Sequence, residues 1–312
     1  MGMSRWWMVS AACAILSVIP GCKNKRAIPP VEQVQRPAPL LEDVIAVVNG
    51  RADKLGRVWA RAVTSIAWTQ PDGTKRSEQG EGFFQLVQPS SLALDIGKVG
   101  EVVIWAGCDA SRYWVIRRGD EKTAIFGRHD GPGSDRLMEE GLPVTPLDMI
   151  ELSGVTPIAD WATAPSLGWT TDGYWVVEER RPYGTLVREV EPRTGEPRRV
   201  SMKSGGKTRV ESVLVNAAPV ERANTSDWAR MPTRITVADL VTGSTIVVGL
   251  EGLSDGIRGR RPGNERMQPA VFDFEVLCEK LGVQRVEDLD AAAVPAGVPA
   301  QVSGRGGGPV SP

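Results

Sequence analysis

The stretch that decides the fold is RVWARAVTSIAWTQPDG, residues 57–73. Its even-numbered positions from Val58 to Trp68 carry Val, Ala, Ala, Thr, Ile and Trp, whereas the positions between them are mixed and include Arg61 and Ser65. Successive side chains of a strand point to opposite faces, so this alternation predicts a strand with one face toward a core. Pro71-Asp72-Gly73 is a turn sequence, which predicts that the chain reverses there.

Further β-rich segments follow at short spacing, which favours antiparallel hairpins. A short helix is expected at Pro146–Leu152, and an amphipathic helix is expected over 40–54, where Leu41, Val44 and Val48 share one stripe. The expected strands are 80–87, 92–96, 101–108, 112–117 and 122–127 before the short helix, and 173–179, 185–191, 198–203, 207–215, 233–240, 244–250 and 272–277 after it. This order predicts a mainly β (α+β) fold, in which a long antiparallel meander, interrupted once by a helix, forms an open or nearly closed β-barrel and not a sandwich.

Two of these expected strands are apolar on both faces. They are residues 102–105, Val-Val-Ile-Trp, and residues 174–177, Tyr-Trp-Val-Val. Such strands need apolar neighbours on each side, which an amphipathic helix and a packed or ligand-filled interior would provide. The sequence leaves open whether the interior is packed or is an open cavity.

The N-terminus has the charged-then-apolar order of a secretory leader. Arg5 precedes an almost uninterrupted apolar stretch from Trp6 to Ile19, which is short for a membrane span. The stretch ends in Ile19-Pro20-Gly21-Cys22, which resembles the lipobox read by lipoprotein signal peptidase. We expect residues 1–21 to be a lipoprotein signal peptide and Cys22 to carry lipid such as palmitate. An ordinary or uncleaved leader is the alternative.

The rest of the chain divides by composition. Residues 22–39 contain Lys23, Lys25, Arg26 and several prolines, and we expect them to form an extended tether whose basic residues lie near anionic head groups. Residues 40–290 suit a single large β domain. Residues 291–312 are rich in Ala, Pro, Gly and Ser, which predicts a disordered tail.

Composition also argues against several function classes. The chain has 37 basic and 38 acidic residues, whereas a nucleic-acid-binding protein would carry a basic surplus. The single histidine, His129, lies beside a turn without a nucleophile motif, so we expect an exposed loop residue and not a catalytic one. Glu178 and Glu179 are adjacent on an expected strand and would face opposite sides, which does not suit glycoside hydrolysis. We therefore expect no enzyme activity, no metal and no cofactor.

The cysteines leave one question open. Cys13 would leave with the leader and Cys22 would take the lipid, so Cys108 and Cys278 remain. An exported protein permits a disulfide between them. Two separate buried thiols are the alternative, and sequence does not choose.

The chain resembles the lipoprotein-localisation-factor superfamily, that is, the LolA/LolB-like carriers and receptors. The resemblance covers about residues 40–290 and is carried by Val47-Val48-Asn49-Gly50-Arg51, Gly82-Phe83-Phe84, Pro89 to Ile96, Tyr113-Trp114, Pro146-Leu147-Asp148-Met149-Ile150, Pro232-Thr233-Arg234-Ile235-Thr236, Gly282-Val283 and Val286-Glu287-Asp288-Leu289. It implies an N-terminal helix, a curved half-barrel and short helices over an apolar cavity, with no catalytic residue. A lipid on Cys22 would make this chain more similar to the anchored receptors of the family than to its free carriers. The basic insertion Ser254–Pro269 has no counterpart in the family.

The resemblance implies a membrane-anchored lipoprotein that binds a lipid or a lipidated protein in the cell envelope without catalysis. It faces the periplasm, and Lys23 after the lipidated cysteine favours the outer membrane. The candidate walls of a hydrophobic groove are Phe84, Trp105, Trp114 and Trp175, although core packing is the simpler explanation for each tryptophan alone. Arg258, Arg260 and Arg261 in the insertion are candidates for contact with lipid head groups, with a solvated loop as the alternative.

Two other functions stay open at this point. One is an envelope sensor or scaffold on the same fold, with a filled core and a protein partner, and the other is an anchored hydrolase. A cavity that admits an acyl chain would favour the carrier, whereas a packed interior would favour the scaffold. A hydrolase would need polar groups that converge near His129. The ligand, the partner and the oligomeric state are not determined by the sequence.

Overall fold

The computed structural model describes residues 36–70, 72–98, 100–119, 121–131, 137, 142, 144–159, 165–181, 184–223, 225–257 and 266–291. These residues belong to one compact unit that begins at Arg36. The predicted signal peptide, the lipidation site Cys22, most of the tether, the arginines 258, 260 and 261 and nearly all of the predicted tail lie outside the described residues.

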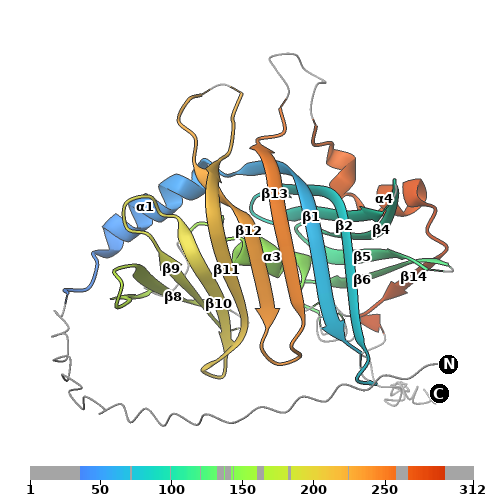
Figure 1. Ribbon diagram of the computed structural model, residues 1–312, viewed down its shortest axis with the longest axis horizontal. Coiled ribbons are helices and arrows are strands. Elements are labelled where there is room, and N and C mark those ends of the chain that lie inside the picture. Colours follow the sequence, from blue (N-terminus) through green and yellow to red (C-terminus); the bar gives the residue numbers. More distant parts are fainter. Residues whose placement is uncertain are drawn as a thin grey trace, which may run out of the picture. The chain divides into compact units, whose positions relative to one another are not determined.

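A single sheet of fourteen strands forms the body of this unit (Figure 1). Its spatial order is β14-β6-β5-β4-β3-β2-β1-β13-β12-β11-β10-β9-β8-β7. Two antiparallel meanders, β1 to β6 and β7 to β13, join where β1 pairs with β13, and β14 pairs with β6 in parallel. The sheet is curved and stays open, with β7 and β14 as its edges, which confirms the predicted mainly β half-barrel.

The strands follow the sequence periods closely. They are β1 (Arg57–Thr69), β2 (Lys75–Val87), β3 (Ser91–Lys98), β4 (Glu101–Cys108), β5 (Arg112–Arg118), β6 (Lys122–Arg128), β7 (Ser166–Trp169), β8 (Trp175–Arg181), β9 (Gly184–Val190), β10 (Pro197–Ser204), β11 (Lys207–Pro219), β12 (Arg230–Asp239), β13 (Thr245–Ser254) and β14 (Arg285–Asp288). The four-residue strands β7 and β14 were not predicted, because a period of two cannot be recognised over four residues.

The predicted helices are present, and one predicted strand is wrong. The expected helices are α1 (Leu41–Asp53) and α3 (Pro146–Leu152). Residues 272–277, expected as a strand, lie instead in the short helix η1 (Pro269–Phe272) and in α4 (Phe274–Leu281). Asp273 caps α4 by accepting a hydrogen bond from the Val276 N–H, and Gly282 ends it with a left-handed φ of 65°. These two signals, and not the apolar pattern, mark the helix.

The inner face of the sheet carries the main core, and α3 packs against it. Figure 1 shows α3 behind the long central strands. Ile150 and Leu152 of α3 are fully buried in the same cluster as Val58 of β1 and Phe84 of β2. Thr145 and Asp148 form a reciprocal capping box that starts α3.

The other two helices cover opposite faces of the sheet. On the inner face, α1 packs its Val44 and Val48 against Trp175 and Val177 of β8. On the outer face, α4 packs against β5 and β6, whose residues Trp114, Ile116 and Ala124 alternate with the inner-face residues Val115 and Ile125. The doubly apolar segment 102–105 therefore has a helix on one side and the packed interior on the other, since Trp105 joins the cluster of α4, a helix that the sequence did not predict, and Ile104 joins the main core.

The two remaining cysteines are separate thiols. Cys108 lies on the inner face, where its Sγ donates to the Ser90 carbonyl, whereas Cys278 belongs to α4 on the outer face. Burial raises the pKa of the Cys108 thiol. Because the sheet lies between them, a disulfide is not formed in this structure.

Candidate functional site

The four residues predicted to line one groove lie in three different clusters. Phe84 is in the main inner core, Trp175 is on the inner face beside α1, and Trp105 and Trp114 are on the outer face beside α4. The ring centroids of Trp114 and Phe274 are 5.7 Å apart. The structure thus joins Trp105 with Trp114 and separates both from the other two, because neighbouring positions of a strand face opposite sides. The four side chains thus do not form one shared wall in this structure, and a role in ligand binding stays a prediction for each.

The inner face, where a carrier would hold its ligand, is filled by the chain itself. Val144, Met149 and Val155 belong to the main core together with the fully buried α3 residues Ile150 and Leu152. They pack against inner-face residues of both meanders, including Leu186, Val200 and Ile235. Between the described residues, these side chains form a packed core.

Polar contacts hold the segment after α3 in this position. Asn49 of α1 donates to the Ile158 carbonyl at 3.1 Å and accepts from the Ile158 N–H at 2.8 Å. Arg51 of α1 donates to the Gly154 carbonyl at 2.7 Å, and Gln88 donates to the Val155 carbonyl at 2.9 Å. Each of these bonds satisfies a backbone group near the core, so the segment is specified by its partners and not only by apolar burial.

A buried ion cluster lies on the inner face of β8 and β9. The Glu179 carboxylate, fully buried, is 3.1 Å from Arg188 Nε and 3.1 Å from Arg181 Nη2. Arg188 also donates to the Thr156 carbonyl at 2.6 Å. Burial lowers the pKa of nearby Arg51 to about 10. The cluster neutralises charges that the filled interior has taken out of water.

The adjacent glutamates face opposite sides of β8, as predicted. Glu178 points outward, 3.0 Å from Lys203 Nζ, whereas Glu179 points inward to the arginines. They therefore cannot flank one bond. His129 Nε2 lies 2.8 Å from the Asp109 carbonyl oxygen, so its contact is a backbone group and not a side-chain acid or nucleophile.

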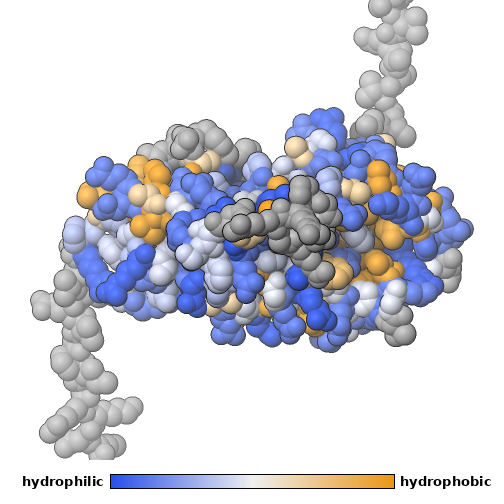
Figure 2. Space-filling view, turned by 90° about the horizontal axis from the view of Figure 1, so that it is seen from above, coloured by the Kyte–Doolittle hydropathy of each residue, from blue (hydrophilic) through white to orange (hydrophobic). Residues whose placement is uncertain are grey.

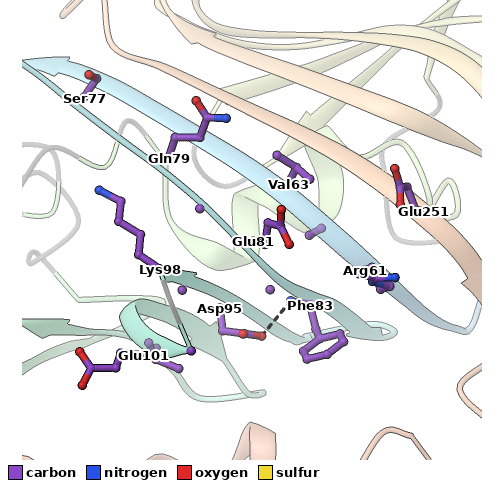
Figure 3. A pocket seen from close by; sticks show the side chains of 16 residues that line it. Arg61, Val63, Ser77, Gln79, Glu81, Phe83, Asp95, Lys98, Glu101 and Glu251 are labelled. Carbon is purple, nitrogen blue, oxygen red and sulfur yellow. Dashed lines mark hydrogen bonds between the residues drawn. The ribbon is translucent and has the colours of Figure 1, made fainter.

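A cavity of about 1220 Å³ opens on the outer face, and sequence reasoning missed it (Figure 3). It lies in a fork: β2 pairs with β1 from Lys75 onward, but β2 pairs with β3 only from Glu81, which lies opposite Gly97. The lining comes from β1, β2, β13 and the β3–β4 hairpin. The labelled members in Figure 3 are Arg61, Val63, Ser77, Gln79, Glu81, Phe83, Asp95, Lys98, Glu101 and Glu251.

Two glycines allow the close approach of β2 and β3 beside this cavity. A Cβ on Gly82 would lie 2.0 Å from the Asp95 carbonyl oxygen, and a Cβ on Gly80 would lie 2.4 Å from the Gly97 carbonyl oxygen. Any other residue at either position would force the two strands apart. The sequence Gly80-Glu81-Gly82 within an expected strand was the signal that could have indicated this close approach.

Asp95 is the buried charged group of the fork. Its side chain lines the cavity although the residue is only 8 % exposed, and its Oδ1 accepts from the Phe83 N–H at 3.0 Å. Burial raises the pKa of this carboxyl to about 6, against the lowering effect of the Phe83 hydrogen bond. Among the described residues no lysine or arginine forms an ion pair with Asp95.

The described part of the chain offers neither a metal-binding cluster nor a membrane-crossing helix. No group of three or more metal-binding side chains lies together there. None of the helices in that part combines the length and the apolar character that a membrane crossing requires. Figure 2 shows hydrophobic residues gathered at the two ends of one face, with mostly hydrophilic residues elsewhere on it.

Comparison with known proteins gives structural likeness at low identity. No family model matches the chain, and no curated protein matches it. A DUF1329 family protein from Desulfovibrio piger superposes with a TM-score of 0.43 and 13 % identity over 76 % of this chain and 98 % of its own. A LolA superfamily protein from Nitrosomonas europaea superposes with a TM-score of 0.42 and 15 % sequence identity, over 76 % of this chain and 99 % of its own. A domain from Vibrio parahaemolyticus, described as a putative outer membrane lipoprotein-sorting protein domain, superposes with a TM-score of 0.40 and 10 % sequence identity. The superposition covers 76 % of this chain and 99 % of that domain.

One of these three structures is a LolA superfamily protein. All three TM-scores lie below 0.5, so the description of the fold depends on the sheet order and the helices given above.

Proposed function

We propose that this chain is a non-catalytic, lipid-anchored protein of the cell envelope that binds a protein partner through its outer surface while its core stays filled. The observation that supports the filled core is the packing of α3 and residues 153–158 on the inner face. An acyl chain needs apolar volume, and here the chain's own side chains occupy the face that would supply it. The anchor rests on Cys22 and the apolar leader before it.

A carrier of acyl chains is the second candidate, and a specific observation favours it. The inner face is apolar across both meanders, and the helix that covers its centre, α3, has only seven residues. A ligand would gain about 25 cal/mol for each Å² of apolar surface that it buries there. To enter, it has to displace α3 and break the contacts that Asn49, Arg51 and Gln88 make with residues 154–158.

Native mass spectrometry of the full-length protein in mild detergent separates the two candidates. The filled-core protein is expected to carry its covalent lipid and no second lipid that organic solvent removes. Arg51→Ala loosens the segment after α3, and Arg61→Ala, on the exposed outer face, is the matched control. Neither variant is expected to bind a fluorescent fatty acid. Stoichiometric non-covalent lipid in the wild type, or uptake by Arg51→Ala alone, would support the carrier and overturn the filled-core function.

The protein partner is tested by photo-cross-linking in cells. A photoreactive amino acid at Val63 or Val215, both exposed on the outer face, is expected to give a discrete cross-linked protein. The same residue at Leu240, exposed in the turn after β12, is the control. Equal labelling at all three positions would contradict binding through the outer face. A Cys22→Ser variant that still incorporates labelled fatty acid would contradict the anchor.

A further inference from the structure

The outer-face fork combines a free strand edge with a buried carboxyl group, and nothing in the filled core explains either. We propose that the fork binds an extended segment of the protein partner, which pairs with the edge of β2 and places one lysine or arginine side chain against Asp95. This inference rests on the proposed function, because it names the chemistry of the partner that the outer surface takes.

The strand edge supplies the backbone part of the site. Residues from Lys75 to Gln79 pair with β1, and no described residue pairs with them on the other side. In an antiparallel pair, every second residue directs its N–H and C=O away from the partner, so this stretch presents unpaired groups to the fork. An added strand satisfies such groups without changing the sheet, which is how many domains recognise extended peptides.

The carboxyl group supplies the charge part of the site. Asp95 is 8 % exposed, lines the cavity and accepts one backbone hydrogen bond, from Phe83. Its second oxygen has room beside it because position 82 is a glycine. A buried carboxylate without a cation is unfavourable, and a lysine ammonium or an arginine guanidinium supplies both the countercharge and the donors that are missing.

The charges around Asp95 favour a cation as well. Lys98 is paired with Glu78, Glu101 is paired with Arg118, and both side chains point away from Asp95 (Figure 3). Arg61 stands directly opposite Glu251 in the register of β1 and β13, and such opposite charges balance each other. Glu81 and Asp95 then remain as the excess acidic groups in the lining.

The size of the fork selects a peptide over a free amine. The cavity holds about 1220 Å³, more than the roughly 300–1,000 Å³ of typical small-molecule pockets. Phe83 and Val63 are each 42 % exposed on its floor and offer apolar contact to neighbouring side chains of a peptide. Lys75 and Arg76 lie at the outer end of the free edge, so a segment with a single basic residue fits better than a polybasic one.

The test measures peptide binding to the full-length protein by fluorescence anisotropy. The probe is the labelled heptapeptide Thr-Val-Thr-Lys-Thr-Val-Thr. The control peptide has the same sequence with norleucine in place of lysine. The lysine peptide is expected to bind about tenfold more tightly than the norleucine peptide, the ratio that one charge-assisted contact supplies. Asp95→Asn is expected to remove this preference. Free 1,5-diaminopentane is expected to compete only weakly, since it cannot pair with the edge of β2.

A second variant keeps the test decisive if Asp95→Asn does not fold. Gln79→Lys adds a positive charge at an exposed lining position and is expected to weaken the lysine peptide about tenfold. Leu240→Lys, which adds the same charge at an exposed turn position outside the cavity lining, is the matched control and should bind as the wild type does. Equal binding of the two peptides, or an unchanged affinity in Gln79→Lys, would overturn the proposal. Binding of the diamine as tight as that of the peptide would overturn the strand pairing.

The outcome is independent of the test for a filled core. Co-purified acyl lipid would reject the proposed function whatever the peptides do. Loss of the lysine preference, with no acyl lipid and with cross-linking at the outer face intact, would reject the fork alone.

Discussion

Two Tyr-Trp dipeptides in the chain direct their tryptophan side chains to opposite faces of the sheet. Tyr113-Trp114 in β5 points its tryptophan outward, beneath α4, whereas Trp175, which follows Tyr174 at the start of β8, points inward, beside α1. Both tryptophans are buried, at 0 % and 7 % exposure. The difference between the two regions is which face receives a helix, and no property of the dipeptide decides that.

The comparison extends to the charges that each region buries. The inner face of β8 and β9 holds Glu179 between two arginines. The outer face at the fork holds Asp95 with one backbone hydrogen bond and no cation among the described residues. Two arginine side chains of this chain neutralise Glu179, whereas Asp95 could accept a cation from a bound partner. This contrast separates a structural ion cluster from a binding site.

The largest effect is expected when the outer face loses its aromatic core. Trp114→Ala removes the fully buried ring that contacts Phe274, and we expect the free energy of unfolding to fall by about 4 kcal/mol. Trp228→Ala, at a loop tryptophan that is 39 % exposed, is the control and should change it by less than about 1 kcal/mol. Urea unfolding followed by circular dichroism measures both. Similar values for the two variants would mean that α4 does not stabilise this face.

The next effect concerns the ion cluster of the inner face. Glu179→Gln leaves Arg181 and Arg188 without the carboxylate that lies between them, and we expect a loss of about 3 kcal/mol. The neighbouring Glu178→Gln removes a partly exposed pair with Lys203 and should cost less than about 1 kcal/mol. Chemical denaturation of the two variants side by side tests whether adjacent residues of β8 face opposite sides. If their costs were equal, that assignment would be wrong.

The smallest effect is a pH dependence that arises at the fork. Burial in the folded state raises the pKa of Asp95 to about 6, above the ordinary value of about 3.9. The folded state therefore binds this proton more tightly than the unfolded state does. Stability from this group is therefore full at low pH, and about 2 kcal/mol of it is lost as the pH rises from about 4 to about 6.

Asp95→Asn should remove that slope and make the protein more stable than the wild type at neutral pH. Unfolding free energies of both proteins at several pH values across this window provide the measurement. A slope that persists unchanged in Asp95→Asn would assign the titration to another group.

Much of the fold could be predicted because strand periodicity is local. The alternation after Arg57 and the stripe on residues 40–54 depend on side chains a few residues apart, and the structure has β1 and α1 at these places. The failures have equally local causes: Phe274–Leu281 is too short to separate a helical period from a run of apolar residues, and the capping signals of Asp273 and Gly282 were not weighed.

The site could not be predicted in the same way. Asp95 stands in an apolar strand, and its burial depends on Gly82 of the neighbouring strand, thirteen residues away, and on the point where β2 separates from β3. The four candidate aromatics were chosen for being large and apolar, which indicates burial but not which cavity or cluster receives them.

By itself, the sequence determined α1, α3 and most of the strands, the apolar stretch that precedes Cys22, and the near-neutral charge, because each is a property of neighbouring residues or of their sum. Only the tertiary structure decided that α3 fills the inner face, that α1 and α4 cover opposite faces, and that Asp95 is buried in the fork with no cation from the described residues beside it. These features depend on contacts between residues far apart in the chain, and a strand's own pattern states that it has two faces without stating what will cover each of them.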